Sequence, residues 1–531
     1  MKHTDIIRKL NLEQKCALLS GETVFTTRAL PGKGIPSITL SDGPNGVRKQ
    51  AGAADHLGLN PSVPATCFPT SSATACSWDE ALGEAVGEAM GEEAAAQEVA
   101  VLLGPGLNIQ RSPLCGRDFE YFSEDPILAG KMAAAYVRGI QKKGIAACPK
   151  HFAVNSQELR RMASDSVVDE RTLRELYLTG FEIVVKEARP KTIMTSYNLI
   201  NGTYANENAH LLQDILRKDW GFDGAVVTDW GGSNDHALGV KNGSTLEMPC
   251  PGGDSIRELM KAVKDGKVTE ADLDARLDEL LELVLSTHAA VEKAPRTFDA
   301  AAHHALARRA AAESIVLLKN EDGILPLKAG EKLAVIGDFA QTPRYQGAGS
   351  SAVNALQVDA LLDCIKADDS GISFVGYASG FDRQGAADLK KQEEAVSLAK
   401  QADTVLLCLG LDELRESEGL DRADMALAEN QQQLLDAVAA VNPNVVVLLS
   451  AGAPVETPWA GRCKALVYGA LGGQAGAGAA ADILTGKLCP CGKLSQTWAQ
   501  AHDDTPAKAN FGGEGRNVEY REGLYVGYRY Y

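Results

Sequence analysis

Residues 192–230 read TIMTSYNLINGTYANENAHLLQDILRKDWGFDGAVVTDW and contain a clear strand–helix–strand pattern. The apolar, β-branched runs 192–197 and 225–228 at the two ends predict short buried strands. A helix is predicted between them, from Asn208 to Gly221. Its apolar face would consist of Leu211, Leu212, Ile215 and Leu216. A strand, a helix and a second strand in close succession are typical of a parallel sheet covered by helices.

The same alternation continues through the first half of the chain. Further buried strands are predicted at 38–40, 99–103, 145–148 and 246–248. Asp169 is an N-cap residue that predicts the start of a helix, in which residues 173–185 follow the helical spacing of apolar side chains. Serial units of this kind favour an α/β fold with a TIM-like (β/α)8 barrel, which we expect to span residues 1–285.

A second α/β series begins near residue 315. Residues 286–314 predict an interdomain linker that leads into a helix. Strands are then predicted at 333–336, 372–377, 404–409, 445–449 and 465–468, with helices at 389–401 and 426–440. This rhythm is typical of an open, doubly wound sheet, so residues 315–531 are expected to form an α/β sandwich domain.

The composition excludes several classes of function. The 531 residues carry 53 Lys and Arg against 70 Asp and Glu, a formal net charge of −17, without a basic stripe. Such a chain is a poor partner for nucleic acid phosphates or anionic lipids, so we expect neither nucleic acid nor membrane as a partner. Residues 1–21 lack the apolar core of a signal peptide, and the 11 cysteines lack framework spacing. Both observations predict a cytoplasmic protein with free thiols.

Polar side chains follow the predicted barrel strands, at the end where such architectures form their ligand sites. These side chains belong to Ser41-Asp42-Gly43, Lys150-His151, Ser196-Tyr197-Asn198, Asp229-Trp230 and Glu247. The loop 116–126 adds Arg117, Asp118, Glu120 and Glu124. So much polarity at one end of a barrel favours a binding site.

Asp229 is the strongest functional candidate among these residues, because it follows a predicted buried strand and would lie at the barrel rim next to the Trp230 indole. A buried charge is costly unless it is paired, so Asp229 needs cationic neighbours or a chemical role. Lys150, His151 and Arg161 could supply the positive charges. The alternative is a helix N-cap followed by a core tryptophan, and the strand position alone favours neither.

This combination of side chains suits a neutral polyol such as a sugar. An indole face packs on the C–H side of a pyranose, and charged groups bind its hydroxyls. Cleavage of a glycoside also requires a second carboxyl group. The candidates are Glu120, Glu124, Glu158, Glu247 and the acidic loop 412–424. The usual meaning of such a loop is a solvated charge run, so that alternative stays open.

The glycine-rich and cysteine-rich segments do not indicate a cofactor. Residues 472–478 lack the G-x-G-x-x-G spacing of a dinucleotide loop, and residues 347–351 lack the Gly-Lys-Ser/Thr ending of a phosphate loop. Cys489 and Cys491 have no second pair or nearby His to complete a zinc site.

Motifs in the first half of the chain resemble glycoside hydrolase family 3, the β-glucosidase branch. They are Ser41-Asp42-Gly43-Pro44-Asn45-Gly46-Val47-Arg48, Gly116-Arg117-Asp118-Phe119-Glu120, Lys150-His151-Phe152, Met194-Thr195-Ser196-Tyr197-Asn198 and Val226-Val227-Thr228-Asp229-Trp230. In the second half, Glu416-Ser417-Glu418-Gly419-Leu420-Asp421-Arg422 and the segment 472–484 are similar to the family's sandwich domain. The order of the motifs makes the resemblance specific from near residue 10 to the end.

The resemblance implies a role for each matching residue. Asp229 matches the nucleophile, and Glu418, on a loop of the second domain, matches the acid/base. Glu416 is the rival for the acid/base, because insertions make this loop easy to misalign. The matching sugar-binding residues are Asp42, Arg117, Lys150, His151, Arg161, Tyr197, Trp230 and Ser350. No metal or organic cofactor is implied, and a small-molecule glycoside is the expected partner, while homo-oligomer formation stays open.

The implied chemistry sets expectations for the two carboxyl groups. Cations such as Lys150 and Arg161 should keep Asp229 ionised, whereas neighbouring negative charges on a mobile loop should raise the pKa of Glu418. A retaining mechanism places the two carboxyl groups about 5–5.5 Å apart.

The expected activity is that of an exo-acting retaining β-glucosidase, which releases terminal non-reducing β-D-glucosyl residues by double displacement. After Lys150-His151-Phe152 the sequence lacks the glycine-rich Asp-His loop of the family's N-acetylglucosaminidases, which favours a sugar with a free hydroxyl at its second carbon. The alternatives are a β-xylosidase or α-L-arabinofuranosidase on the same scaffold and, from another class, a catalytically silent sugar-binding protein. Family members commonly continue from a segment like 520–530 into a fibronectin-III-like third domain. We do not expect this domain in a sequence that ends at Tyr531, and both a naturally short family member and a protein that has lost its C-terminal domain stay open as explanations.

Overall fold

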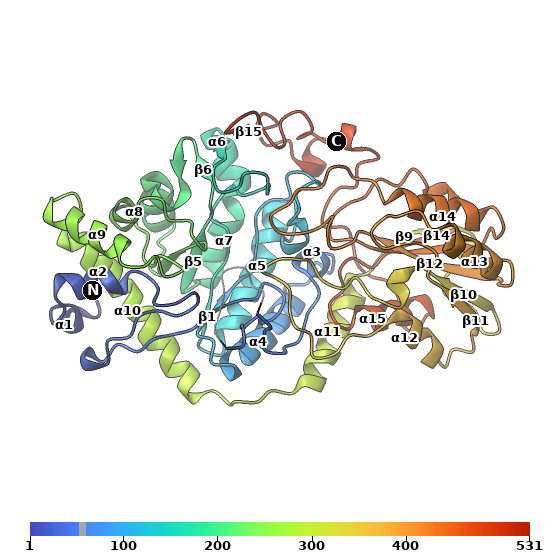
Figure 1. The fold of residues 1–531 in the computed structure, drawn as a ribbon, viewed down its shortest axis with the longest axis horizontal. Helices are drawn as coiled ribbons and strands as arrows, with labels where there is room; N and C mark the ends of the chain where they lie inside the picture. Colours follow the sequence, from blue (N-terminus) through green and yellow to red (C-terminus); the bar gives the residue numbers. More distant parts are fainter. Residues whose placement is uncertain (53–59) are drawn as a thin grey trace.

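The computed structural model describes residues 1–52 and 60–531. Two halves lie along the long axis of the molecule, and the C-terminal half contains a six-stranded sheet (Figure 1). The halves are built around separate clusters of buried apolar side chains. In the described residues no helix is long and apolar enough to cross a membrane.

Short parallel strands form the centre of the N-terminal half. These strands are β1 (Leu40–Asp42), β2 (Val101–Leu103), β3 (Ala146–Ala147), β5 (Thr192–Thr195) and β8 (Ala225–Thr228). β1, β2 and β3 pair in this order, and β5 pairs with β8. A parallel bridge between Phe152 and Thr195 joins the two sheets.

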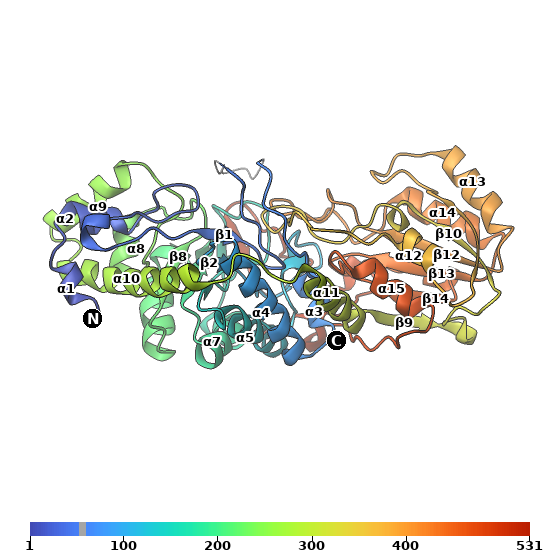
Figure 2. The same ribbon diagram turned by 90° about the horizontal axis from the view of Figure 1, so that it is seen from below.

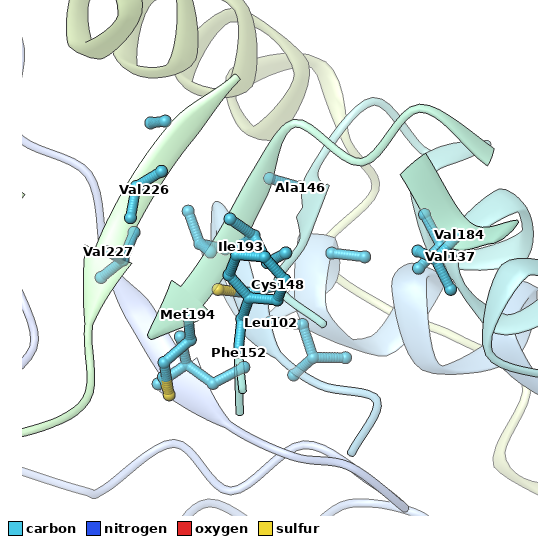
Figure 3. Close-up of a cluster of buried hydrophobic side chains, with 14 of the residues drawn as sticks. Leu102, Val137, Ala146, Cys148, Phe152, Val184, Ile193, Met194, Val226 and Val227 are labelled. Atoms are coloured by element: carbon cyan, nitrogen blue, oxygen red, sulfur yellow. The ribbon is translucent and has the colours of Figure 1, made fainter. Parts of the chain in front are cut away.

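Helices cover these strands on the outside. They are α1 (Thr4–Ile7), α2 (Leu12–Leu18), α3 (Ser71–Ala75), α4 (Glu80–Ala96), α5 (Pro126–Gln141), α6 (Glu170–Thr172), α7 (Thr179–Ala188), α8 (His236–Asn242) and α9 (Asp254–Lys264), with the π-helices η3 (Leu173–Tyr177) and η5 (His210–Asp219). α4, α5 and α7 pack next to one another (Figure 2). Figure 3 shows the core, in which Leu102, Ile193 and Val226 of the strands gather with Phe152, and the covering helices contribute Val137 and Val184.

Most strands predicted for this half are confirmed, and two differ. The strand at 38–40 is wrong by two residues, because pairing with β2 starts at Leu40 and includes Asp42. No regular strand forms at 246–248, where the N–H of Met248 donates to the hydroxyl of Thr228 at 2.8 Å instead of to a strand partner. The helix predicted from Asn208 is confirmed as η5, and the Asp169 carboxylate caps α6 by accepting the N–H of Thr172. The eight-fold barrel stays a prediction.

The segment predicted as a linker is largely helical. α10 (Glu270–Lys293) and α11 (Ala300–Ser314) occupy most of residues 286–314, and only 294–299 lie outside a helix. The two helices follow one another along the side of the molecule (Figure 2). Sequence patterning suggested a linker because Pro295 interrupts an alanine-rich stretch, but the proline lies between two helices rather than in a long flexible segment.

A six-stranded sheet forms the centre of the C-terminal half, with the order β11-β10-β12-β13-β14-β9. Its strands are β9 (Val316–Asn320), β10 (Lys332–Ile336), β11 (Ser373–Ala378), β12 (Thr404–Gly410), β13 (Val445–Ser450) and β14 (Ala465–Tyr468). Its helices are α12 (Leu361–Ala367), α13 (Leu389–Ala399), α14 (Glu429–Ala439) and α15 (Gly476–Leu484). The predicted strands and helices are confirmed, whereas the antiparallel edge strand β9 was not predicted.

The end of the chain returns to the N-terminal half. β15 (Asn517–Glu519) pairs in parallel with β4 (Asp165–Val167), in a small sheet that also contains β6 (Leu199–Ile200) and β7 (Thr203–Tyr204). This sheet lies at the edge of the molecule next to α6 (Figure 1). Arg111 forms a buried ion pair with Glu522 and stacks on the ring of Tyr520 at 3.8 Å. The C-terminal segment therefore packs against the N-terminal half.

Candidate active site

A cavity of about 630 Å³ lies where the ends of the β1, β5 and β8 strands meet loops of the C-terminal half. All the residues predicted for the site line this cavity. They are Asp42, Arg117, Lys150, His151, Arg161, Tyr197, Asp229, Trp230, Ser350 and Glu418. The sequence prediction therefore brought together side chains from both halves that the fold places around one space.

Asp229 directly follows β8 and is 8% exposed. Its Oδ1 accepts the N–H of Trp230 at 2.8 Å, which fixes the rotation of the carboxylate. Among the described residues, Oδ2 has no hydrogen-bond partner, and its distance to Nε2 of His151 is 3.6 Å. One carboxylate oxygen is thus held and the other is available to a ligand.

Glu120 orients two cations of the cavity wall. Its Oε2 lies 2.6 Å from Nη2 of Arg117, and its Oε1 lies 3.1 Å from Nζ of Lys150. All three side chains are almost completely buried. Glu120 was a candidate for the second carboxyl group of the site, but these two ion pairs give it a supporting role instead.

Asp42 and His151 lie on the same wall. Burial raises the pKa of Asp42 to about 6, although Lys150 and Arg48 oppose this shift. Burial and the neighbouring cations, Arg117 first among them, lower the pKa of His151 well below its usual value, so its ring is neutral. The backbone of His151 exchanges two hydrogen bonds with the Asn108 side chain, which fixes its position.

Aromatic side chains form another wall of the cavity. The Trp230 indole donates to the carbonyl of Val24 at 2.7 Å, and the Phe25 ring lies against it with a centroid distance of 5.3 Å. The Tyr197 hydroxyl donates to the carbonyl of Trp230 at 3.0 Å. The Arg161 guanidinium lies 4.9 Å from the centroid of the Tyr197 ring. These contacts offer a rigid apolar face next to Asp229.

Glu418 reaches the cavity from the loop 411–428, which connects β12 to α14. Its Oε1 lies 2.8 Å from Nη1 of Arg161 and 3.4 Å from Nη1 of Arg117. Its Oε2 accepts the backbone N–H of Ser350 at 2.7 Å. The loop is therefore not a solvated charge run at this point, because its central glutamate is bound by both halves.

The pKa values of the two carboxyl groups shift in opposite directions. Burial raises the pKa of Asp229, and the cations Arg161, Arg117 and Lys150 only partly oppose it. Burial acts in the same direction on Glu418, but Arg117, Arg161 and the hydrogen bond from Ser350 outweigh it and hold the pKa below its usual range. The expected direction at Glu418 is therefore wrong, because two guanidinium groups outweigh burial there. At Asp229 the cations act against burial as expected, and the ionised form of Asp229 stays a prediction.

The remaining candidate carboxyl groups are occupied elsewhere. Both oxygens of Glu416 accept the N–H of Gly452, at 2.8 and 3.0 Å, and Glu416 does not line the cavity. Glu124 accepts hydrogen bonds from Thr497 and Tyr528, and Glu247 from Ser255. The geometry therefore favours Glu418 over its rival.

Within residues 1–52 and 60–531, no group of three or more potential ligand side chains is arranged around a metal position.

Sequence reasoning missed part of the cavity lining. The additional residues are Val24, Phe25, Arg48, Gln50, Met194 and Gly349. Arg48 belongs to the quoted motif that starts at Ser41, so the motif could have identified it. Phe25 gave no such signal, since it lies in an irregular segment without periodicity.

Comparisons with known proteins match both halves of the chain. Residues 53–283 match the Glycosyl hydrolase family 3 N terminal domain, and residues 315–528 match the Glycosyl hydrolase family 3 C-terminal domain. The chain is 47% identical over 529 residues to "Thermostable beta-glucosidase B" of Acetivibrio thermocellus, with 99% of this chain and 70% of that protein covered. It is 45% identical to an "Exo-alpha-(1->6)-L-arabinopyranosidase" of Bifidobacterium breve, with the same two coverages.

Solved structures show the same similarity in three dimensions. A Bifidobacterium adolescentis GH3 β-glucosidase superimposes with a TM-score of 0.93 at 44% identity, over 99% of this chain and 76% of that one. β-Glucosidase 3B from Thermotoga neapolitana, in complex with glucose, superimposes with a TM-score of 0.91 at 33% identity, over 100% of this chain and 81% of that one. With both domains matched and its sequence aligned almost from end to end, the chain belongs to glycosyl hydrolase family 3.

Proposed function

We propose that the protein is an exo-acting, retaining β-glucosidase that removes terminal β-D-glucosyl residues. The observation that carries this proposal is the single cavity in which Asp229 of the N-terminal half and Glu418 of the C-terminal half lie among cations and an indole. The beta-glucosidase names of several relatives support the choice of glucose.

We also infer that the strands of the N-terminal half belong to a (β/α)8-type barrel, which the bridges from Val227 to Leu246 and from Ser20 to Glu247 support.

In the first step, Asp229 attacks the anomeric carbon of the sugar. Its Oδ2, which the protein leaves without a hydrogen bond among the described residues, forms the new bond to carbon. The bond from that carbon to the aglycone oxygen breaks, and Glu418 gives its proton to the leaving oxygen. The products of this step are the free aglycone and a glycosyl ester of Asp229.

In the second step, water replaces Asp229 on the anomeric carbon. Glu418, now a carboxylate, takes a proton from the water as its oxygen bonds to the carbon. The ester bond breaks, and glucose leaves with the configuration it had in the substrate. Two inversions therefore give retention, and both carboxyl groups return to their starting forms.

Glu418 has to hold a proton before the first step. Arg117 and Arg161 stabilise its carboxylate. A sugar whose hydroxyl groups accept hydrogen bonds from these guanidinium groups weakens their hold on Glu418. Substrate binding and protonation of the acid are coupled in this proposal.

The cavity suits one terminal sugar unit. Its volume is in the usual range for a small-molecule site, about 300–1,000 Å³. Asp42, Lys150 and His151 present charged and polar groups to sugar hydroxyls, and Trp230 presents a flat face to the C–H side of the ring. Both features favour a neutral glycoside as the substrate.

A pentoside is the second candidate substrate, since a relative with 45% identity is named as an arabinopyranosidase. A xyloside or arabinoside lacks the hydroxymethyl group of glucose, which would lie beside Asp42 and Arg117. The two candidates therefore differ in the occupation of one corner of the same cavity, with the same roles for Asp229 and Glu418.

Hydrolysis of a panel of aryl glycosides tests the proposal. The wild type is expected to prefer the β-glucoside over the β-xyloside and α-arabinosides, and Asp229→Ala should lose activity on all of them. Asp235→Ala is the matched control, because Asp235 follows the same strand but caps α8. Equal aglycone release by wild type and Asp229→Ala would refute the role of Asp229. Binding of glucose without hydrolysis would instead identify a silent sugar-binding protein.

A further inference from the structure

The loop 411–428, which carries Glu418, is joined to the N-terminal half by two carboxylates that do not line the cavity. Asp421 belongs to the loop, and Glu158 belongs to the N-terminal half. Asp421 accepts several backbone hydrogen bonds from the opposite half, and Glu158 accepts one. The proposed function assigns no role to either residue.

Asp421 accepts three backbone N–H groups from the N-terminal half. Its Oδ1 lies 3.1 Å from the nitrogen of Gly116 and 2.9 Å from that of Glu158. Its Oδ2 lies 3.0 Å from the nitrogen of Glu158 and 2.8 Å from that of Leu159. Hydrogen bonds to a carboxylate are stronger than those between neutral groups, so this contact holds the loop against two separate segments.

Glu158 makes the reciprocal contact. Its Oε2 accepts the N–H of Gly419, the residue after Glu418, at 2.7 Å. The same oxygen lies 2.8 Å from Nη1 of Arg161, which also lies 2.8 Å from Oε1 of Glu418. Glu158 therefore positions both the backbone beside Glu418 and one cation that binds its side chain.

The two halves approach each other closely at this contact. A Cβ atom on Gly116 would lie 1.6 Å from the carbonyl oxygen of Leu420, so only glycine fits there. Arg422 donates its backbone N–H to Leu114 and its guanidinium to the carbonyl of Pro113. The loop follows the surface of the N-terminal half on both sides of Asp421.

We propose that Asp421 and Glu158 form a carboxylate latch that sets the position of Glu418 over the cavity. The inference rests on the proposed function, because it takes Glu418 as the acid/base. In this view the latch residues are positioning residues, since they act on the reaction only through Glu418.

The latch should affect proton transfer by Glu418 rather than attack by Asp229, because Asp229 and Glu418 are held by separate parts of the protein. Asp229 follows a strand of the N-terminal half, and in the described part of the chain its side chain is bound by the N–H of Trp230 and lies near His151 rather than near Asp421 or Glu158. A general acid works only within hydrogen-bond distance of the leaving oxygen. A displaced loop therefore impairs proton donation, while attack by Asp229 continues. For substrates whose leaving group departs without a proton, kcat/KM should change little.

The test compares kcat/KM of Asp421→Asn and wild type on two β-glucosides, one with a dinitrophenyl and one with a phenyl leaving group. The amide places an NH2 group where a carboxylate oxygen accepts backbone N–H groups. We expect a loss of roughly 10- to 100-fold with the phenyl glucoside, within the 10²–10⁴-fold that general-acid catalysis supplies. With the dinitrophenyl glucoside, whose leaving group departs as a stable phenolate, kcat/KM should change by less than about 3-fold.

Two further variants complete the design. Asp424→Asn is the matched control, because Asp424 lies in the same loop and accepts only the N–H of Ala426 among its backbone contacts in the described structure. Glu158→Gln removes the ion pair with Arg161 and weakens the contact with Gly419 while Asp421 stays unchanged, and it should reproduce the leaving-group dependence even if Asp421→Asn does not fold. Circular dichroism checks the fold of each variant.

Equal fractional losses on both glucosides, or no loss in either variant, would overturn the latch. Glu418→Ala in the same assay separates this failure from a failure of the proposed function. If Glu418→Ala shows the leaving-group dependence and the latch variants do not, the latch alone is refuted. If Glu418→Ala shows none, Glu418 is not the acid, and the latch falls with that assignment.

Discussion

Asp229 and Glu418 lie in the same cavity, but the chain holds them by different means. Asp229 directly follows β8, whose four residues are in parallel register with β5. Glu418 lies in a long loop and is held by Arg161, Arg117 and the backbone of Ser350. A local strand positions the first carboxyl group, whereas contacts between distant segments position the second. The nucleophile should therefore tolerate changes in the interface between the halves, and the acid/base should not.

Removal of the Glu418 carboxyl group should cause the largest loss of kcat/KM among the variants considered below. We expect Glu418→Ala to lower kcat/KM for the phenyl β-glucoside by about 10²–10⁴-fold, because no group then protonates the leaving oxygen. Steady-state kinetics check this, with added azide as a small nucleophile that replaces base-assisted water in the second step.

Glu416→Gln is the control that separates the two glutamates of the loop. Glu416 binds the N–H of Gly452 away from the cavity, so this variant should retain the leaving-group dependence of the wild type. A loss confined to poor leaving groups in Glu416→Gln, and absent from Glu418→Ala, would reverse the assignment.

Substitution of Gly349 should displace the Glu418 side chain without changing its chemical groups. Gly349 has a φ of +113°, and a Cβ atom there would lie 2.4 Å from Cβ of Glu418. We expect Gly349→Ala to destabilise the protein by about 1–3 kcal/mol and to lower kcat/KM for the phenyl glucoside by roughly 10-fold. Thermal unfolding and kinetics measure the two effects. Gly461→Ala, where a Cβ meets open space, should be close to wild type, and equal behaviour of both variants would argue against the packing of Glu418 on Gly349.

Replacement of Arg161 should shift the pH dependence. Burial raises the pKa of Asp229 and Arg161 opposes it, while Arg117 and Arg161 together lower the pKa of Glu418 against burial. Loss of this cation should therefore raise both pKa values and move the profile of kcat/KM to higher pH. The profile of Arg161→Gln is compared with that of Arg160→Gln, whose side chain binds backbone carbonyls of the C-terminal segment instead. A shift to lower pH would contradict the charge assignment.

Ser350 should give the smallest effect. It contacts Glu418 through its backbone N–H, and its carbonyl lies 3.5 Å from Nη1 of Arg48. Ser350→Ala keeps both groups and should change kcat/KM by less than about 3-fold. Ser350→Pro removes the N–H and should resemble Gly349→Ala. A large loss in Ser350→Ala would assign the hydroxyl a direct role, either on Glu418 or on the sugar.

The same contrast explains which features could be predicted from the sequence. β8 and Asp229 follow from an apolar run that ends in a carboxylate, which is a local pattern. The position of Glu418 came from resemblance to a family, since nothing local distinguishes its loop from a solvated acidic segment. Its pKa was predicted with the wrong sign, because Arg117 and Arg161 lie hundreds of residues away in the chain. The pairing of β15 with β4 was missed for the same reason.

The most direct test of the account is to trap the covalent intermediate on Asp229. A dinitrophenyl glucoside with fluorine in place of the hydroxyl at the second carbon should glycosylate the protein and release it only slowly. Digestion and mass spectrometry should then find the sugar on the peptide that contains Asp229, with retained configuration in the product of slow turnover. A label on any other carboxylate, or turnover of the normal substrate with inverted configuration, would contradict the account.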